Sequence, residues 1–162
     1  MDDHTRDPTV QPPPAGQDPP GWMAAEGRWA HDTLRQATIH GVRLANAGEY
    51  HEAHDCFEDE WFNYGNGTME KSFLQGMTQV AAGAYKYTGF DNSAGLRKLF
   101  DSAHGYLEGI PDQFYGVAVA ALRDDIEAIR YNPQQVESLQ IALDGRYPTA
   151  REEDLGYAAS LP

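Results

Sequence analysis

Apolar residues recur along the chain at intervals of three and four, the period of helices that face a core. Between about 24 and 47 this pattern runs up to Gly48, which predicts a helix that stops there. Between 49 and 64 the apolar spacing is i, i+3, i+7, i+11 and i+14. A single stripe of this kind predicts a second helix, carried by Tyr50, Ala53, Phe57, Trp61 and Tyr64.

Residues that start or stop helices divide the rest of the chain. Thr68 can cap a third helix, and Asn92 or Ser93 can cap a fourth. The third helix is rich in glycine and alanine, so a neighbouring helix can approach it closely. Asn132 followed by Pro133 is a start signature for a short sixth helix. Together these signals predict helices at about 68–89, 93–109, 119–131 and from 133 onward.

The two ends of the chain differ from its middle. Six prolines fall within residues 1–21, and the sequence after Leu143 is mixed and polar. No alternation of apolar and polar residues is long enough to argue for a sheet. We therefore predict an all-α protein, a compact antiparallel bundle of about five to six helices. An irregular Pro-rich arm (1–21) precedes the helical domain (22–143), and an irregular tail (144–162) follows it.

Charge is the most uneven global property of the sequence. Asp and Glu total 25 against 12 Lys and Arg, giving a formal net charge of −13. Such a surface repels phosphate backbones and anionic lipids, so we expect neither nucleic acid nor membranes as partners. Only three of the basic residues are lysines, and an acidic, lysine-poor composition is typical of halophilic proteins from an archaeal-like cytoplasm. Cys56 is the single cysteine and no signal-like segment opens the chain, so we expect a cytoplasmic location.

Ionisable residues gather on the second predicted helix. His51, His54, Asp55 and Glu58 are spaced by three and four residues, which places them on one flank of a helix. Two imidazoles and two carboxylates there form a candidate site for a divalent metal. Alternatively, His54 and Glu58, with Asp55, are candidate catalytic residues for general-base chemistry. A hydrogen-bonded structural pair is the simpler interpretation of the same spacing.

The third predicted helix adds Gln75 and Gln79, two uncharged amides one turn apart. If the second and third helices pack antiparallel, these amides can face His54 and Glu58. One interpretation is an interhelical polar network that sets the register of the two helices. The other is a binding pocket in which Gln75 and Gln79 act together with Trp61 and Tyr87.

These segments carry a resemblance to a known family. The stretch HEAHDCFEDEW, followed by FLQGMTQVAAGAYKYTGF, resembles the prokaryotic domain-of-unknown-function family numbered 309, over roughly residues 45 to 130. Asp55 stands where the family pattern has glutamate, one methylene longer. The resemblance implies a small helical fold and no established activity. The matching positions are Glu52-Ala53-His54, Glu58, Trp61, Phe73-Leu74-Gln75-Gly76 and Gln79.

Three functions are compatible with the sequence. The absence of a recognised catalytic motif favours a non-catalytic interaction or structural module, with another protein or a second copy of the chain as its partner. One alternative is a small enzyme that uses His54 and Glu58, such as a metal-dependent hydrolase. The other alternative is a small-molecule pocket that uses the same groups without chemistry.

Overall fold

The structure is a computed structural model that describes residues 3–162. It is mainly helical, which confirms the prediction of an all-α bundle. In chain order the elements are η1 (Asp3–Thr5), β1 (Trp22–Met23), β2 (Arg28–Trp29), α1 (Asp32–Asn46), α2 (Tyr50–Trp61), α3 (Met69–Phe90), α4 (Ser93–Leu107), α5 (Val119–Tyr131), η2 (Pro133–Ser138) and α6 (Glu152–Ala159).

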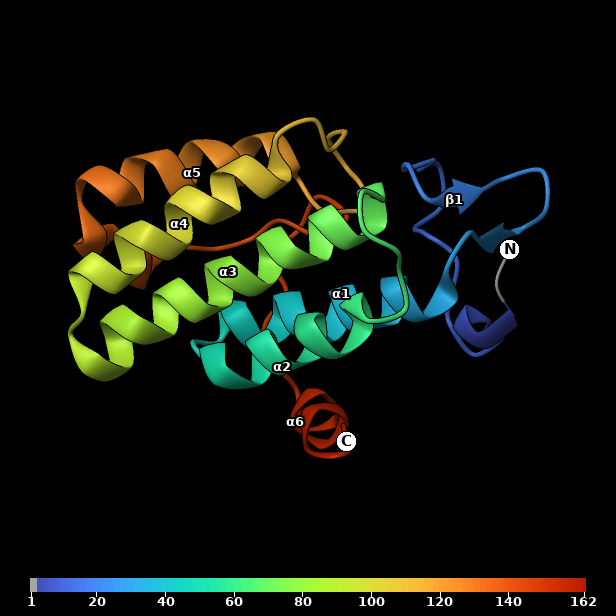
Figure 1. Cartoon of the computed structure of the whole chain (residues 1–162). Coiled ribbons are helices and arrows are strands. Elements are labelled where there is room, and N and C mark those ends of the chain that lie inside the picture. Colours follow the sequence, from blue (N-terminus) through green and yellow to red (C-terminus); the bar gives the residue numbers. More distant parts are fainter. Residues whose placement is uncertain (1–2) are drawn as a thin grey trace.

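Helices α1 to α5 pack in chain order, each against the next, with short turns between the first four (Figure 1). The core between them is apolar and includes Leu34, Phe57, Phe73, Leu74, Phe100, Leu107 and Ile126, all at most 1% exposed. Two glycines of α3 allow α4 to come close. A Cβ atom at Gly76 would lie 2.6 Å from Cγ of Leu107, and one at Gly83 would lie 2.6 Å from the Phe100 ring. The expected close approach to the third helix is therefore present.

The predicted caps of α3 and α4 are formed. The Thr68 hydroxyl accepts a hydrogen bond from the Lys71 amide at 3.2 Å, and the Asn92 side chain accepts one from the Gly95 amide at 2.8 Å. Asp91 ends α3 in the left-handed conformation with φ of 52°. Because caps depend on residues within one turn of the helix end, the sequence is sufficient to predict them.

The first helix is shorter than predicted. It begins at Asp32, and part of the segment expected to be helical forms a two-stranded hairpin, with Trp22 opposite Trp29. Gly27 has φ of 65°, which suits the turn between the strands. Trp29 is 1% exposed, and its indole N–H donates to the Gln11 carbonyl at 2.9 Å. With only two residues in each strand, the hairpin has no alternation that the sequence could reveal.

The Pro-rich arm is held by its own chain. The Pro20 carbonyl accepts from the Tyr115 amide at 2.8 Å, and the Asp7 amide donates to Asp32 at 2.9 Å. Val10 packs against the core. Since the hairpin follows the arm directly, these contacts fix where α1 begins.

The prediction of an irregular tail needs a correction, because residues 152–159 form α6. Figure 1 shows the C-terminal segment crossing behind α3 before α6 lies below α1 and α2. Asp154 anchors this helix: it is fully buried and accepts from the Arg151 amide and from His40, both at 2.7 Å. The apolar pattern of α6 is weak, since Leu155 is 43% exposed, and a polar anchor of this kind leaves no periodic signal. Among the described residues, no helix is long and apolar enough to cross a membrane.

Candidate functional site

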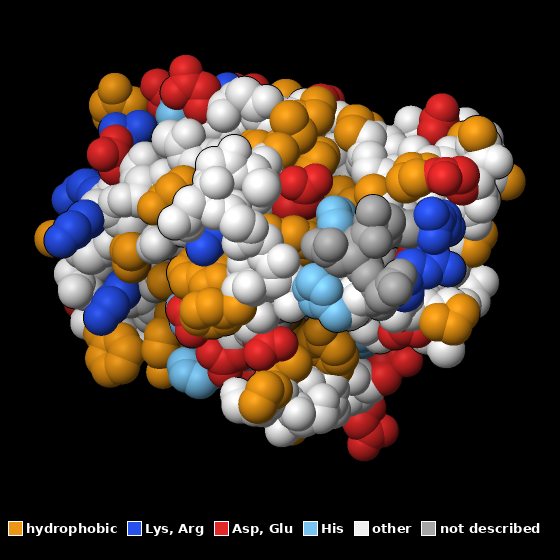
Figure 2. Space-filling model, turned by 45° about the vertical axis from the view of Figure 1, so that its right-hand side comes forward, with side chains coloured by type: hydrophobic (Ala, Val, Ile, Leu, Met, Phe, Trp, Pro, Cys, Tyr) orange, Lys and Arg blue, Asp and Glu red, His pale blue; other side chains and the backbone are white. Residues whose placement is uncertain are grey.

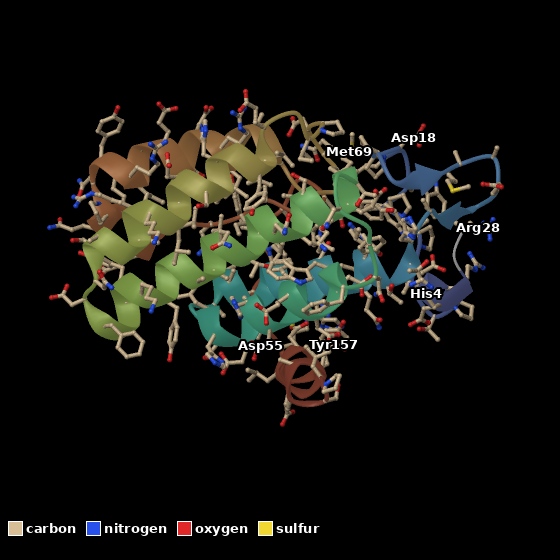
Figure 3. The ribbon with its side chains drawn as sticks, in the orientation of Figure 1. His4, Asp18, Arg28, Asp55, Met69 and Tyr157 are labelled. Carbon is tan, nitrogen blue, oxygen red and sulfur yellow. The ribbon has the colours of Figure 1, made fainter. Side chains whose placement is uncertain are left out.

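Helix α2 places the predicted ionisable residues on its outer flank. Its inner face buries Ala53 and Phe57, at 0% and 1% exposure. His54, Asp55 and Glu58 lie beside that stripe, around the helix from it, and are partly exposed. Figure 3 shows Asp55 on the lower side of α2, next to α6. The helical spacing alone accounts for this placement.

The four residues form a chain of contacts along the flank. His51 Nδ1 lies 3.6 Å from Asp55 Oδ2, and Asp55 Oδ1 lies 3.1 Å from His54 Nδ1. The other ring nitrogen of His54, Nε2, lies 3.4 Å from Glu58 Oε2. Both nitrogens of His54 therefore face a carboxylate, and a doubly protonated ring can donate to both. We call this set the α2 ladder: His51, Asp55, His54 and Glu58.

The α2 ladder is at the surface. The side chain of His54 is 28% exposed, and its partners Asp55 and Glu58 are 42% and 41% exposed. Water competes with such pairs, so each contributes at most about 1 kcal/mol to stability. Within the described residues, no three His, Cys, Asp or Glu side chains are grouped so that they could hold a metal ion. The metal site and the catalytic roles remain predictions.

The glutamines do not join the ladder. Gln75 and Gln79 are half-buried, and among the described residues neither amide forms a hydrogen bond with His54 or Glu58. Gln79 lies at helical spacing between Gly76 and Gly83, on the side of α3 that packs against α4. The expected hydrogen-bonded network between the two helices is therefore not formed.

The other two residues of the predicted pocket are separated. Trp61 and Tyr87 both pack against the core, but Trp61 ends α2 whereas Tyr87 lies in the last turn of α3. Since α2 and α3 run in opposite directions, these residues lie toward opposite ends of the pair. The nearest hollow, of about 400 Å³, lies at the start of α2 and is lined by His51, Glu52, Tyr85 and Thr88 among others.

Cys56 lies within the sequence of the ladder but takes no part in it. Its side chain faces the core and is 0% exposed. Burial, and after it the charge of the nearby Asp55 carboxylate, raises the pKa of the thiol to about 12. At neutral pH the sulfur is a protonated, inaccessible core atom, so it is not available as a nucleophile.

A buried carboxylate beside the ladder went unpredicted. Glu60 is 4% exposed and accepts hydrogen bonds from Thr33 Oγ1 and from the Tyr64 hydroxyl, both at 2.7 Å. Burial, followed by the charge of Glu60, raises the pKa of Tyr64 far above its ordinary value. Glu60 falls three residues after Phe57, on the apolar stripe of α2. This position in the sequence could have predicted that the carboxylate is buried.

A second feature outside the prediction is an arginine-lined hollow of about 600 Å³. It lies between α1, the N-terminal arm and the segment before α6, and four arginines line it. The innermost is Arg35, 4% exposed, whose guanidinium donates to both carboxylate oxygens of Asp144 at 3.0 and 2.6 Å. It also donates to the Tyr115 carbonyl at 2.8 Å and lies 4.7 Å from the centre of the Trp29 ring.

Residues 38–99 match the model of the family described as Domain of unknown function (DUF309). The resemblance to DUF309 is therefore confirmed. The matched segment holds all of α2 and α3, parts of α1 and α4, and thus the whole α2 ladder. The arginine-lined hollow is only partly inside it, since Asp144 and the residues after it follow the match. A comparison with curated proteins gives no match.

Proposed function

We propose that this chain is a non-catalytic interaction module that binds a basic protein segment along the outer face of α2 and α3. The observation that carries the proposal is uncompensated charge. Residues 49–59 contain five carboxylates and no Lys or Arg. Among the described residues, none of the five forms an ion pair with a Lys or Arg. They are Glu49, Glu52, Asp55, Glu58 and Asp59.

Apolar side chains flank these carboxylates and provide a second, independent support. Seven large apolar side chains are exposed in the described part of the chain, and four of them lie on α3 or next to it. Phe62 (75%) and Met69 (44%) lie at one end of the α2–α3 pair, and Tyr85 (37%) and Phe90 (64%) lie at the other. Figure 3 shows Met69 at the start of α3. In Figure 2 orange apolar side chains, a histidine and red carboxylates meet at the lower edge of the molecule.

This arrangement suits one kind of partner. The twelve residues of α2 extend about 18 Å at 1.5 Å per residue, so about three turns of a partner helix fit between the two apolar ends. Buried apolar anchors supply most of the binding energy of an interface, while charges around them set specificity and association rate. A helix with lysine or arginine on one side and apolar residues at its ends complements this face.

The proposal can be tested with a defined peptide. A fluorescein-labelled amphipathic helix of leucine and lysine is titrated with the protein, and binding is followed by fluorescence anisotropy at fixed salt. We expect the triple variant Glu52→Gln, Asp55→Asn, Glu58→Gln to bind at least about tenfold more weakly, because each charged contact at an interface contributes on the order of 1 kcal/mol.

The matched control removes the same charge elsewhere. Glu108, Asp124 and Glu137 are exposed and form no ion pair in the described structure. The triple variant Glu108→Gln, Asp124→Asn, Glu137→Gln should change affinity less than twofold. Equal weakening by both triples would mean that the peptide senses only net charge, and the proposal would be abandoned. Peptide-independent self-association, seen by sedimentation velocity, would instead identify a second copy as the partner.

The contacts of His54 support a second candidate function, a metal-dependent hydrolase. Its imidazole lies 3.4 Å from Glu58 and 3.1 Å from Asp55. Imidazole nitrogen is a ligand that zinc, iron and nickel accept, and carboxylate oxygens can complete such a site. Elemental analysis of tag-free protein purified without chelator tests it. If the protein contains near-stoichiometric metal and the His54→Ala variant does not, a metal-dependent hydrolase would be favoured over the interaction module.

The net charge of −13 also supports our inferences about environment. It disfavours nucleic acid and anionic membranes as partners and suits a salt-rich cytoplasm, where molar salt screens repulsion over about 3 Å.

A further inference from the structure

We propose that the arginine-lined hollow binds a small organic anion that carries at least two negative charges as phosphate or carboxylate groups. The hollow holds about 600 Å³. Small-molecule sites commonly occupy about 300–1,000 Å³, so the size suits a metabolite. The site is unrelated to the α2 ladder and does not depend on the interaction module.

The charge of the lining is opposite to that of the protein. Arg35, Arg43, Arg146 and Arg151 line the hollow, and Asp144 is its only acidic lining residue, which leaves a net charge of +3. The whole chain carries −13 and has only nine arginines. Nearly half of the arginines therefore meet in one place, on a molecule whose field otherwise repels anions.

Ion pairs within the described part of the chain partly offset this positive charge but leave one arginine unpaired. Arg35 is neutralised by Asp144. Arg43 lies 3.3 Å from Glu153 and 3.5 Å from Asp154, and Arg151 lies 3.5 Å from Glu153. Arg146 is exposed and forms no ion pair among the described residues. A guanidinium group presents paired N–H donors that match phosphate and carboxylate oxygens. The guanidinium of Arg146 is therefore available to bind such a group.

Two buried donors add an observation that does not depend on net charge. The Nε atoms of Arg35 and Arg43 are buried, and within the described structure neither has a hydrogen-bond partner. A buried N–H without an acceptor is unfavourable, and native proteins rarely retain one without cause. Both residues line the hollow, but their Nε atoms are shielded from it, so an anion there gives either atom an acceptor only if the guanidinium group turns toward it.

The rest of the lining indicates that the ligand has an apolar part. Ile39 lies between the two arginines of α1, at a spacing of four residues from each, and Leu143 and Tyr147 come from the other side. The Tyr147 side chain is 64% exposed and has room to cover a ligand. We therefore infer an organic anion rather than a free inorganic ion.

The experiment uses the full chain with pyrophosphate and citrate as probes, titrated by isothermal calorimetry against sodium chloride of equal ionic strength. Tighter binding of pyrophosphate would identify phosphate as the recognised group, and tighter binding of citrate would identify carboxylate. We expect Arg146→Gln to weaken the binding of the preferred probe by about tenfold or more, because it removes one charge-assisted contact.

Arg97→Gln is the matched control. Arg97 is exposed and forms no ion pair in the described structure, and it lies on α4, away from the hollow. This variant should change the affinity less than twofold. The proposal is overturned if neither probe binds above the chloride background, or if Arg97→Gln weakens binding as much as Arg146→Gln does.

Discussion

The contact with the clearest energetic consequence is the pair between Arg35 and Asp144, which joins α1 to the segment that leads into α6. Arg35 makes three hydrogen bonds, two of them to the carboxylate, and is 4% exposed. We predict that Arg35→Met lowers the free energy of unfolding by about 3 kcal/mol. Removing one member of a buried pair costs about 3–5 kcal/mol. The lower end applies because Asp144 is 16% exposed and water can solvate part of its charge.

The methionine keeps most of the apolar volume beside Trp29, so the loss reports on the guanidinium rather than on a cavity. The Tyr115 carbonyl contributes to that loss, since it is left without its donor at this site. A double-mutant cycle with Asp144→Asn isolates the pair. Asp144 has φ of 56°, a left-handed conformation that asparagine tolerates as well as aspartate, so this change removes charge without straining the backbone.

Urea is the suitable denaturant, because it is uncharged and leaves the electrostatic interaction unscreened. Unfolding is followed by circular dichroism at one fixed salt concentration, and the coupling energy of the cycle should be at least about 1 kcal/mol. If Arg35→Met costs less than about 1 kcal/mol, or if the coupling is below about 0.5 kcal/mol, the pair does not anchor the C-terminal segment and this reasoning is wrong.

Four further predictions concern two glycines, the buried thiol and the α2 ladder. Gly76→Ala should destabilise by about 1–3 kcal/mol in urea unfolding, since its Cβ would lie 2.6 Å from Leu107. Gly105→Ala, which meets nothing within 4 Å in α4, should stabilise by about 0.5–1 kcal/mol. Cys56 should resist a thiol reagent at pH 8 in the folded protein and react at once in urea. Because its folded pKa is raised from 9.0 to about 12, the thiol stabilises the fold below pH 9, and this contribution is lost as the pH rises from 9 toward 12. His54→Ala should lower the free energy of unfolding by less than about 1 kcal/mol, because the ring is 28% exposed; a loss above about 2 kcal/mol would show that the ladder is part of the core.

The parts of the fold that sequence reasoning predicted are those determined within a few residues. The apolar stripe of α2 and the caps Thr68 and Asn92 depend on neighbours one or two turns away, and the structure confirms them. The start of α1 depends instead on the slot that holds Trp29, whose indole reaches Gln11 eighteen residues earlier. No local propensity encodes such a contact, so the hairpin went unpredicted.

The same distinction applies to the candidate sites. Helical spacing alone brings His51, His54, Asp55 and Glu58 onto one flank, and the sequence was sufficient to find them. Whether Gln75 reaches that flank depends on how α3 is rotated, and its rotation follows from the close packing of its glycines against α4. The arginine-lined hollow requires residues more than a hundred positions apart, as the separation of 109 between Arg35 and Asp144 shows.

Salt provides a way to distinguish the two proposed binding surfaces in one preparation. Carboxylates of the α2 face such as Asp55 and Glu58 are partly exposed, so the affinity for a basic peptide should fall steeply as salt shortens the screening length from about 10 Å at 0.1 M to about 3 Å at 1 M. In the hollow, Arg35 is 4% and Arg43 19% exposed, and charges shielded from solvent are screened much less. Anion binding should therefore persist at salt concentrations that abolish peptide binding. The opposite order would mean that the exposed Arg146 acts without help from the buried arginines, and that the hollow does not enclose its ligand.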